Sequence, residues 1–245
     1  MRNPQRLWRR HCDAVHVDLL SRWLPKRLGS VLKTDLFDEA SGEGLTPWLC
    51  ARAESVTGVD LSKKVIDLAR GRHAGLVTVL ADVRELPFPA ESFDVVVSNS
   101  TLDHFDEAAD VDVALGELQR VLRPGGVLVL TLDNLDNPVV WIRNLLPPSL
   151  LRRAGLIPYH VGPTLGPVAT ASHLAAKGFE IGELCAVSHC PRLPAIAMAS
   201  CFDRWGGRLA QQRFLRGLMA WERLSAWPTW QRTGYYVAAR ARKTV

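Results

Sequence analysis

The sequence predicts an α/β fold in which helices cover both faces of a mostly parallel sheet. From about residue 30 to residue 135, short apolar stretches alternate with stretches whose apolar residues recur at helical spacing. Two of the apolar stretches, SFDVVVSNS at 92–100 and GVLVLTLD at 126–133, contain runs of valine and leucine. Such runs are typical of parallel strands that are buried on both faces.

The elements of the first half follow from this alternation. Residues 4–24 carry apolar side chains at helical spacing, and Pro25 ends that helix. Ser62 is expected to cap the helix at 62–72, and RPGG is expected to end the helix at 111–122. The remaining predicted elements are strands at 31–37, 55–60, 76–82, 92–100 and 126–133, and a helix at 46–53.

The pattern changes after Asn137. Residues 138–170 hold many prolines and little periodicity, which indicates short helices and ordered loop. A helix at 171–178, a strand at 179–189, a helical insertion rich in Trp and Arg at 191–230 and a strand at 234–243 complete the chain. Because no repeat, low-complexity tract or flexible linker is found, residues 1–245 are expected to form a single domain.

Composition narrows the class of protein. Hydrophobic residues make up 47% of the 245 residues and charged residues 22%, which suits a globular core. No apolar run is long enough to span a membrane, and the N-terminus lacks the apolar core of a signal peptide, so we expect a cytoplasmic protein. The five cysteines contain no CxxC pair, which argues against a disulfide framework or a metal site.

Polar and small residues gather where the predicted strands end. The first strand leads into Asp38, Ala40, Gly42 and Gly44, the second ends at Asp60, the third at Asp82, and the fourth at Ser98, Asn99 and Ser100. Ligands of open parallel sheets bind outside the carboxyl ends of the strands. Small residues allow a ligand to approach the backbone, and carboxylates at 60 and 82 could accept hydrogen bonds from a ribose and from an adenine amino group.

These segments resemble those of the class I S-adenosylmethionine-dependent methyltransferases. LFDEASGEG at 36–44 looks like the first motif of that family, hhDxGxGxG, with Ala40 in place of the first glycine. GVDLS at 58–62, ADVRELPFPAESFDVVVSNSTLDHF at 81–105 and LRPGGVLVLT at 122–131 are similar to later family segments. The resemblance covers about residues 28–135 and the two closing strands. It implies a Rossmann-like seven-stranded sheet whose last strand is antiparallel, with S-adenosylmethionine as the cofactor.

By position, the resemblance also implies roles for individual residues and segments. Asp38, Ala40, Gly42 and Gly44 would surround the methionine part of the cofactor, Asp60 would hold the ribose, Leu61, Asp82 and Val83 would contact the adenine, and Ser98 and Ser100 would line the sulfonium end. Residues 28–137 would form the cofactor-binding core, 1–27 a helical cover, 138–170 a substrate cover, and 171–245 the closing strands with the insertion. The register of the first acid stays open between Asp35, Asp38 and Glu39, and Asp38 best fits the spacing to Gly42 and Gly44.

The expected function is methyl transfer to a small-molecule acceptor. His104, in NSTLDHFD, is the candidate general base, with Asp103 orienting it; the alternative is that His104 only packs in a structural turn. A hydride-transfer site is disfavoured because the third glycine of GxGxxG is missing after Gly44.

Three other interpretations remain. A nucleic-acid methyltransferase is disfavoured because SNST stands where a [DN]PP[YF] motif would be, although the net charge of +5 could attract nucleic acid. A non-catalytic binding or partner protein is suggested by Ala40 and opposed by Asp60 and Asp82. Residues 204–230 place arginines beside apolar side chains and permit a peripheral membrane contact. The acceptor, the methylated atom and the oligomeric state are not defined by the sequence.

Overall fold

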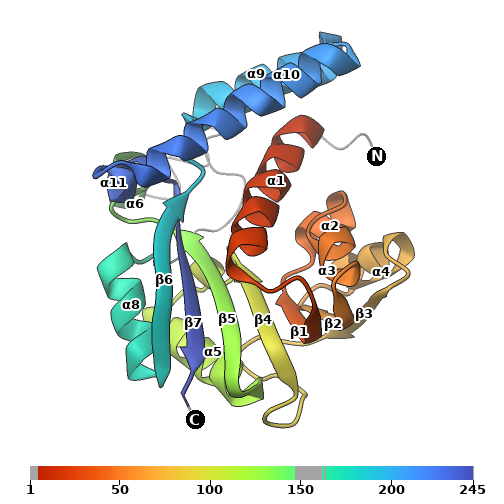
Figure 1. Cartoon of the computed structure of the whole chain (residues 1–245), viewed down its shortest axis with the longest axis vertical. Helices are drawn as coiled ribbons and strands as arrows, with labels where there is room; N and C mark the ends of the chain where they lie inside the picture. Colours follow the sequence, from red (N-terminus) through yellow and green to blue (C-terminus); the bar gives the residue numbers. More distant parts are fainter. Residues whose placement is uncertain (1–4, 147–161, 163, 245) are drawn as a thin grey trace.

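The structure is a computed structural model that describes residues 5–146, 162 and 164–244. Within these residues, seven strands form one sheet in the order β3-β2-β1-β4-β5-β7-β6. Strands β1 to β5 pair in parallel, and β7 runs antiparallel to both β5 and β6. The mostly parallel seven-stranded sheet with an antiparallel last strand is therefore confirmed (Figure 1).

The described elements follow the predicted order. The strands are β1 (Leu28–Thr34), β2 (Ala53–Asp60), β3 (Leu76–Leu80), β4 (Phe93–Asn99), β5 (Leu122–Asp133), β6 (Phe179–Val187) and β7 (Tyr236–Lys243). The helices are α1 (Arg6–Trp23), α2 (Phe37–Ser41), α3 (Thr46–Cys50), α4 (Lys63–Arg72), η1 (Leu102–His104), α5 (Ala108–Val121), α6 (Pro138–Leu145), α8 (Pro167–Ala176), α9 (Arg192–Trp205), α10 (Arg208–Met219), η2 (Ala220–Ala226) and α11 (Trp230–Thr233).

Both faces of the sheet are buried. Successive residues of a strand point to opposite faces, and Val31 and Leu32 accordingly belong to two different apolar clusters. One cluster includes Val15 of α1 and Ile66 of α4, and the other includes Leu115 of α5. The long valine and leucine runs of the strands are thus explained by helices on either side (Figure 1).

The first strand begins and ends three residues earlier than predicted. It ends at Thr34 rather than at residue 37, and Phe37–Ser41 forms the short helix α2. Asp35 causes the break: its backbone is left-handed, with φ of 62°, and its carboxylate accepts a hydrogen bond from the Phe37 N–H at 2.8 Å. Asp and Asn tolerate this conformation and close such turns with their own side chains. The prediction that the strand runs into Asp38 is therefore wrong.

Helix α1 joins the sheet to the helical insertion. Its residues Leu7 and Trp8 form a separate apolar cluster with Ala195 and Ala199 of α9 and Leu218 of α10. In Figure 1 the arrowheads of β5 and β6 point toward the end of the molecule where α1, α9 and α10 lie. The carboxyl edge of the parallel strands is therefore on the side of these helices.

Two further predictions concern the substrate cover after β5 and membrane-spanning helices. Of the expected substrate cover at 138–170, the structure describes residues 138–146, 162 and 164–170, which include α6 and the start of α8, and residues 147–161 and 163 lie outside the described residues. No helix in the described part of the chain is both long enough and apolar enough to cross a membrane.

Candidate active site

The strand registers align the carboxyl ends of the parallel strands. Thr34 of β1 lies opposite Val59 of β2 and opposite Ser98 of β4, and Asn99 lies opposite Thr131 of β5. The residues that leave these strands, which include Asp35, Asp60, Asn99, Ser100 and Asp133, therefore follow one edge. Asp60 and Ser100 accordingly lie at the carboxyl ends of β2 and β4, on either side of β1 along this edge.

A buried ion pair lies directly below this edge. Nζ of Lys33, on β1, is 3.0 Å from Oε2 of Glu39, on α2, and both side chains are almost completely buried. Nζ also donates to the backbone oxygen of Asp35, while Oε1 of Glu39 accepts from the Leu45 N–H at 2.9 Å. Burial lowers the pKa of Lys33, but nearby carboxylates, Glu39 first, outweigh burial and raise it above its ordinary value. Lysine is therefore charged, and the pair fixes α2 to β1.

Further acids surround this ion pair. Burial raises the pKa of Asp35 to about 6, and the charges of Asp60 and Asp38 add to the rise. Asp13 of α1 has its pKa raised to about 7, mainly by burial and then by the charges of Asp38 and Glu39. Such shifts mean that the carboxylates repel one another in a poorly solvated place. A cationic group entering this part of the rim would relieve that repulsion.

Asp38 contacts α1 rather than standing at a strand end. Its Oδ1 accepts a hydrogen bond from Nη1 of Arg9 at 2.6 Å, and the Arg9 guanidinium lies 4.8 Å from the centroid of the Phe37 ring. These contacts hold α1 against α2. They also leave Asp35, which follows β1 directly, as the acid that occupies the strand end.

Asp60 ends β2 and lies partly exposed at the rim. Its Oδ2 accepts from the Leu36 N–H at 2.9 Å, and its Oδ1 accepts from the Ser62 N–H at 2.7 Å. Each carboxylate oxygen has a second lone pair, so both oxygens can accept one more hydrogen bond. The Ser62 side chain caps α4 as predicted, accepting from the Val65 N–H.

Asp82 follows β3 by two residues and is held by Arg84. Arg84 Nη2 lies 2.6 Å from Asp82 Oδ2, and the Arg84 N–H and Nε also donate to this carboxylate. The hydrogen bonds from the Arg84 side chain are the main reason that the pKa of Asp82 is lowered. Arg84 pairs in addition with Asp110 of α5 at 3.1 Å. A ligand that uses Asp82 would have to share it with Arg84.

The other half of the rim contains a buried pair of acids. Asp103 Oδ2 accepts from Ser100 Oγ at 3.0 Å and from the Asp133 N–H at 3.2 Å. Burial raises the pKa of Asp103 to about 6, and the charge of Asp133 adds to the rise. Asp133 in turn is paired with Arg143 of α6, whose Nη1 also donates to the Tyr235 hydroxyl at 3.0 Å. His104, next to Asp103, is exposed at the end of η1.

Several predicted contact residues lie below the surface. Ala40 and Val83 are packed in the two apolar clusters, and Ser98 is fully buried with its hydroxyl bonded to Thr34 at 2.9 Å. In this structure these side chains offer no surface to a ligand. Leu61, in contrast, is 64% exposed beside Asp60.

Gly42 and Gly44 follow α2 but differ in the reason for glycine. Gly42 ends α2 with an extended backbone, and its N–H bonds to the Asp38 backbone oxygen. Gly44 has φ of 57°, and a Cβ at this position would lie 2.4 Å from the Glu39 carboxylate. Glycine is thus required at 44 by the buried ion pair as well as by the turn.

Sequence reasoning missed Lys33, Asp13 and Asp133. Lys33 did carry a signal, since a single charge within the apolar stretch VLKT must find a partner if the strand is buried. Asp13 lies in a helix with many polar residues, and Asp133 ends an otherwise apolar strand. Neither gave a local signal, because their neighbours come from distant parts of the chain.

Comparison with known proteins gives a family match for this region. Residues 37–130 match the model described as "Methyltransferase domain". The chain is 36% identical over 114 residues to the malonyl-[acyl-carrier protein] O-methyltransferase of Salmonella typhimurium, covering 46% of this chain and 42% of that protein. It is 40% identical over 82 residues to the fatty-acid O-methyltransferase of Mycolicibacterium smegmatis, covering 33% and 29%. The match spans less than half the length of each of these two relatives.

The whole fold matches solved structures. The crystal structure of the [4+2]-cyclase SpnF superposes with a TM-score of 0.60 and 21% identity, over 94% of this chain and 80% of that one. At this identity the likeness shows the fold alone. The prediction of a Rossmann-like fold is thereby confirmed, and the matched domain covers the rim from α2 to β5.

Removing one charge of the buried Lys33–Glu39 pair should destabilise the protein more than removing both charges. Lys33→Met leaves the Glu39 carboxylate buried without a countercharge and should lower the free energy of unfolding by about 3–5 kcal/mol. Lys33→Met with Glu39→Gln removes both charges and should recover most of that loss. The matched control is Lys63→Met, in an exposed pair with Asp67 at 2.9 Å, which should cost about 0.5 kcal/mol or less. Urea unfolding measures the free energy of unfolding of all three variants. Equal losses for Lys33→Met and Lys63→Met would contradict a buried, charged Lys33–Glu39 pair.

The raised pKa of Asp103 predicts a pH-dependent stability. Because the pKa in the folded protein is about 6 and the ordinary value is 3.8, the folded protein holds this proton more tightly than the unfolded chain. The contribution is present below pH 3.8 and is lost as the pH rises through about 6. Asp103→Asn does not titrate, so its unfolding free energy relative to wild type should rise by about 1–3 kcal/mol between pH 4 and pH 7. A difference that does not change with pH would exclude this explanation.

Proposed function

We propose that this chain, which carries a class I S-adenosylmethionine-dependent methyltransferase domain, transfers a methyl group to an oxygen atom of a small organic acceptor. The observation that carries the proposal is the line of acids along one edge of a sheet with this topology: Asp35, Asp60 and Asp82 follow three adjacent strands. An oxygen acceptor is supported by the two relatives described above, which are named as O-methyltransferases.

The residues at the end of β2 fit the ribose of the cofactor. Asp60 is partly exposed, and the backbone N–H groups of Leu36 and Ser62 hold its carboxylate in one orientation. Both oxygens keep a lone pair for the two ribose hydroxyls. The exposed side chain of Leu61 supplies an apolar contact for the adenine beside them.

The acids around the Lys33–Glu39 pair fit the other end of the cofactor, which carries an ammonium group. Asp35 and Asp13 have raised pKa values because burial and neighbouring carboxylates oppose their ionisation. An ammonium group beside either carboxyl would favour its ionised form. This would replace repulsion among the acids by attraction to the ligand, and it would couple binding to the position of α1.

The remaining residues suit orientation of the acceptor and transfer of its proton. S-adenosylmethionine supplies a methyl group on a positively charged sulfur, so the chain has to align the acceptor and exclude water. Ser100 follows β4 directly and His104 ends η1, in the segment where the acceptor would lie. Asp103 is bonded to Ser100 and fixes this turn. We propose that His104 accepts the proton of the acceptor and that Asp103 positions the loop.

The cofactor assignment predicts a loss of affinity on removal of one carboxylate. Asp60→Ala should weaken binding of S-adenosylmethionine and S-adenosylhomocysteine about tenfold or more, because hydrogen bonds to a charged acceptor contribute roughly 1.5–3 kcal/mol each. Isothermal titration calorimetry measures the affinity. The matched control is Asp67→Ala on the exposed side of α4, for which the affinity should not change. Unchanged affinity in a folded Asp60→Ala protein would refute the ribose assignment, and no binding to wild type would refute the function.

The proton-transfer role predicts a separate effect on turnover. With S-adenosylmethionine and a panel of fatty acids and phenols, wild type should release S-adenosylhomocysteine in the presence of an acceptor. His104→Ala should lower turnover with that acceptor by about 100-fold and leave cofactor affinity unchanged. Turnover within a few-fold of wild type would show that alignment suffices. Cofactor binding without transfer to any acceptor would favour the non-catalytic alternative.

A further inference from the structure

The net charge of the chain is concentrated in one segment. Residues 191–232 contain seven arginines and two acids, so this segment carries the whole net charge of +5, and the rest of the chain is balanced. The two acids bind inward: Asp203 accepts from the Leu7 N–H at 2.9 Å, and Glu222 accepts from the N–H groups of Ser188 and His189. Neither is therefore well placed to neutralise the exposed arginines.

Helix α9 exposes an apolar face. Met198 is 50% exposed and Trp205 80% exposed, and the side chains between them on the same face are also apolar. Apolar exposed positions recur at helical spacing, with Ser200 and Arg204 exposed beside them: Pro194, Ala197, Met198, Cys201 and Trp205. Leu193, at the start of the helix, extends this face. The opposite face, with Ala195 and Ala199, is the one that packs against α1 and α10.

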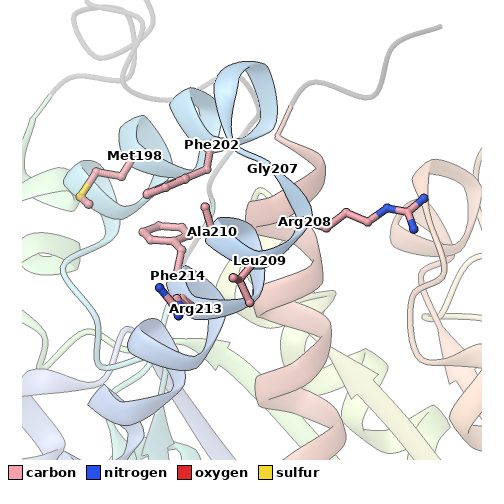
Figure 2. A pocket seen from close by; sticks show the side chains of 8 residues that line it. All are labelled: Met198, Phe202, Gly207, Arg208, Leu209, Ala210, Arg213 and Phe214. Carbon is pink, nitrogen blue, oxygen red and sulfur yellow. The ribbon is translucent and has the colours of Figure 1, made fainter.

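Helix α10 exposes arginines next to that apolar face. Arg208, Arg213 and Arg216 are all exposed. A groove of about 630 Å³ lies between α9 and α10, and Met198, Leu209, Arg208 and Arg213 contribute to its lining. Figure 2 shows Phe202 and Phe214 at this groove, and their rings stack at 4.7 Å between centroids. The groove thus has apolar side chains from both helices with Arg213 at its edge, while Arg208 extends away from it (Figure 2).

We propose that the α9–α10 hairpin docks on the surface of an anionic lipid bilayer. Helices that lie in a membrane interface combine an apolar face with arginines and interfacial tryptophans. The hairpin has all three: the apolar face of α9, the arginines of α10 and Trp205. An acidic protein partner would explain the arginines but would not need so continuous an exposed apolar face. Two copies of the hairpin facing each other would bring like charges together.

The position of the hairpin is consistent with this surface. It contacts α1, and α1 contacts the acidic rim through the Arg9–Asp38 pair. Docking would therefore place the proposed acceptor side of the domain near the bilayer, from which an amphiphilic acceptor could enter. Membrane docking does not depend on methyl transfer, so the two can be tested separately.

Vesicle flotation of the full chain tests the proposal. Wild type should float with phosphatidylcholine vesicles that contain about a third phosphatidylglycerol and should stay behind with pure phosphatidylcholine. Arg208→Gln with Arg216→Gln should lower partitioning by about 25-fold, since each arginine near an anionic surface contributes roughly a factor of five. Trp205→Glu should lower it by about tenfold or more because it removes the most exposed aromatic side chain of the face. Raised salt should weaken wild-type binding.

The matched control removes the same charge elsewhere. Lys64→Gln with Arg72→Gln takes two exposed cations from α4 and should leave partitioning within about twofold of wild type. Circular dichroism and thermal unfolding show that each variant keeps its fold. Equal binding to neutral and anionic vesicles, equal losses in the control, or no binding by wild type would overturn the proposal. A dimer in solution that Trp205→Glu dissociates would also overturn it, by showing that a second copy covers this face.

Discussion

The buried ion pair between Lys33 and Glu39 is the constraint on which the rim depends. A charge inside a strand that is buried on both faces has to meet a countercharge, and the nearest one comes from α2. The pair brings α2 back over the end of β1, and the Leu45 N–H fixes the other Glu39 oxygen. Asp35, Asp38 and Gly44 take their positions from this arrangement. The segment LFDEASGEG at 36–44 therefore contains a short helix, α2, which the ion pair holds against β1.

Acids recur along the rim, and its two halves differ in how those acids are paired. Around β1 and β2, Asp13, Asp35 and Asp60 form a field that favours a cation, and burial raises the pKa of the first two. Around β4 and β5, Asp103 and Asp133 are buried and paired with local partners. The first half suits binding of a charged ligand, and the second fixes the loop that carries Ser100 and His104.

Helix α1 connects this rim to a surface of opposite charge. Its Arg9 pairs with Asp38 at the rim, and its Leu7 and Trp8 pack into the hairpin. The acidic rim and the arginine-rich hairpin are therefore separate in the molecule, and each attracts ligands of the opposite charge.

The sequence alone determined the fold class, the order of the elements and the meeting of Asp60 and Ser100 at one edge. These follow from local periodicity and from the rule that parallel strands end on the same side. It did not determine that β1 ends at Thr34, that Ala40, Val83 and Ser98 are buried, or that Asp103 lies beside Asp133. Spacing along a chain cannot show these features, because strand length is set by pairing with neighbours and burial is set by packing between distant segments. The pairing of Lys33 with Glu39 is the clearest case: the tertiary structure decided it, since a buried charge is stable only where the fold brings its partner.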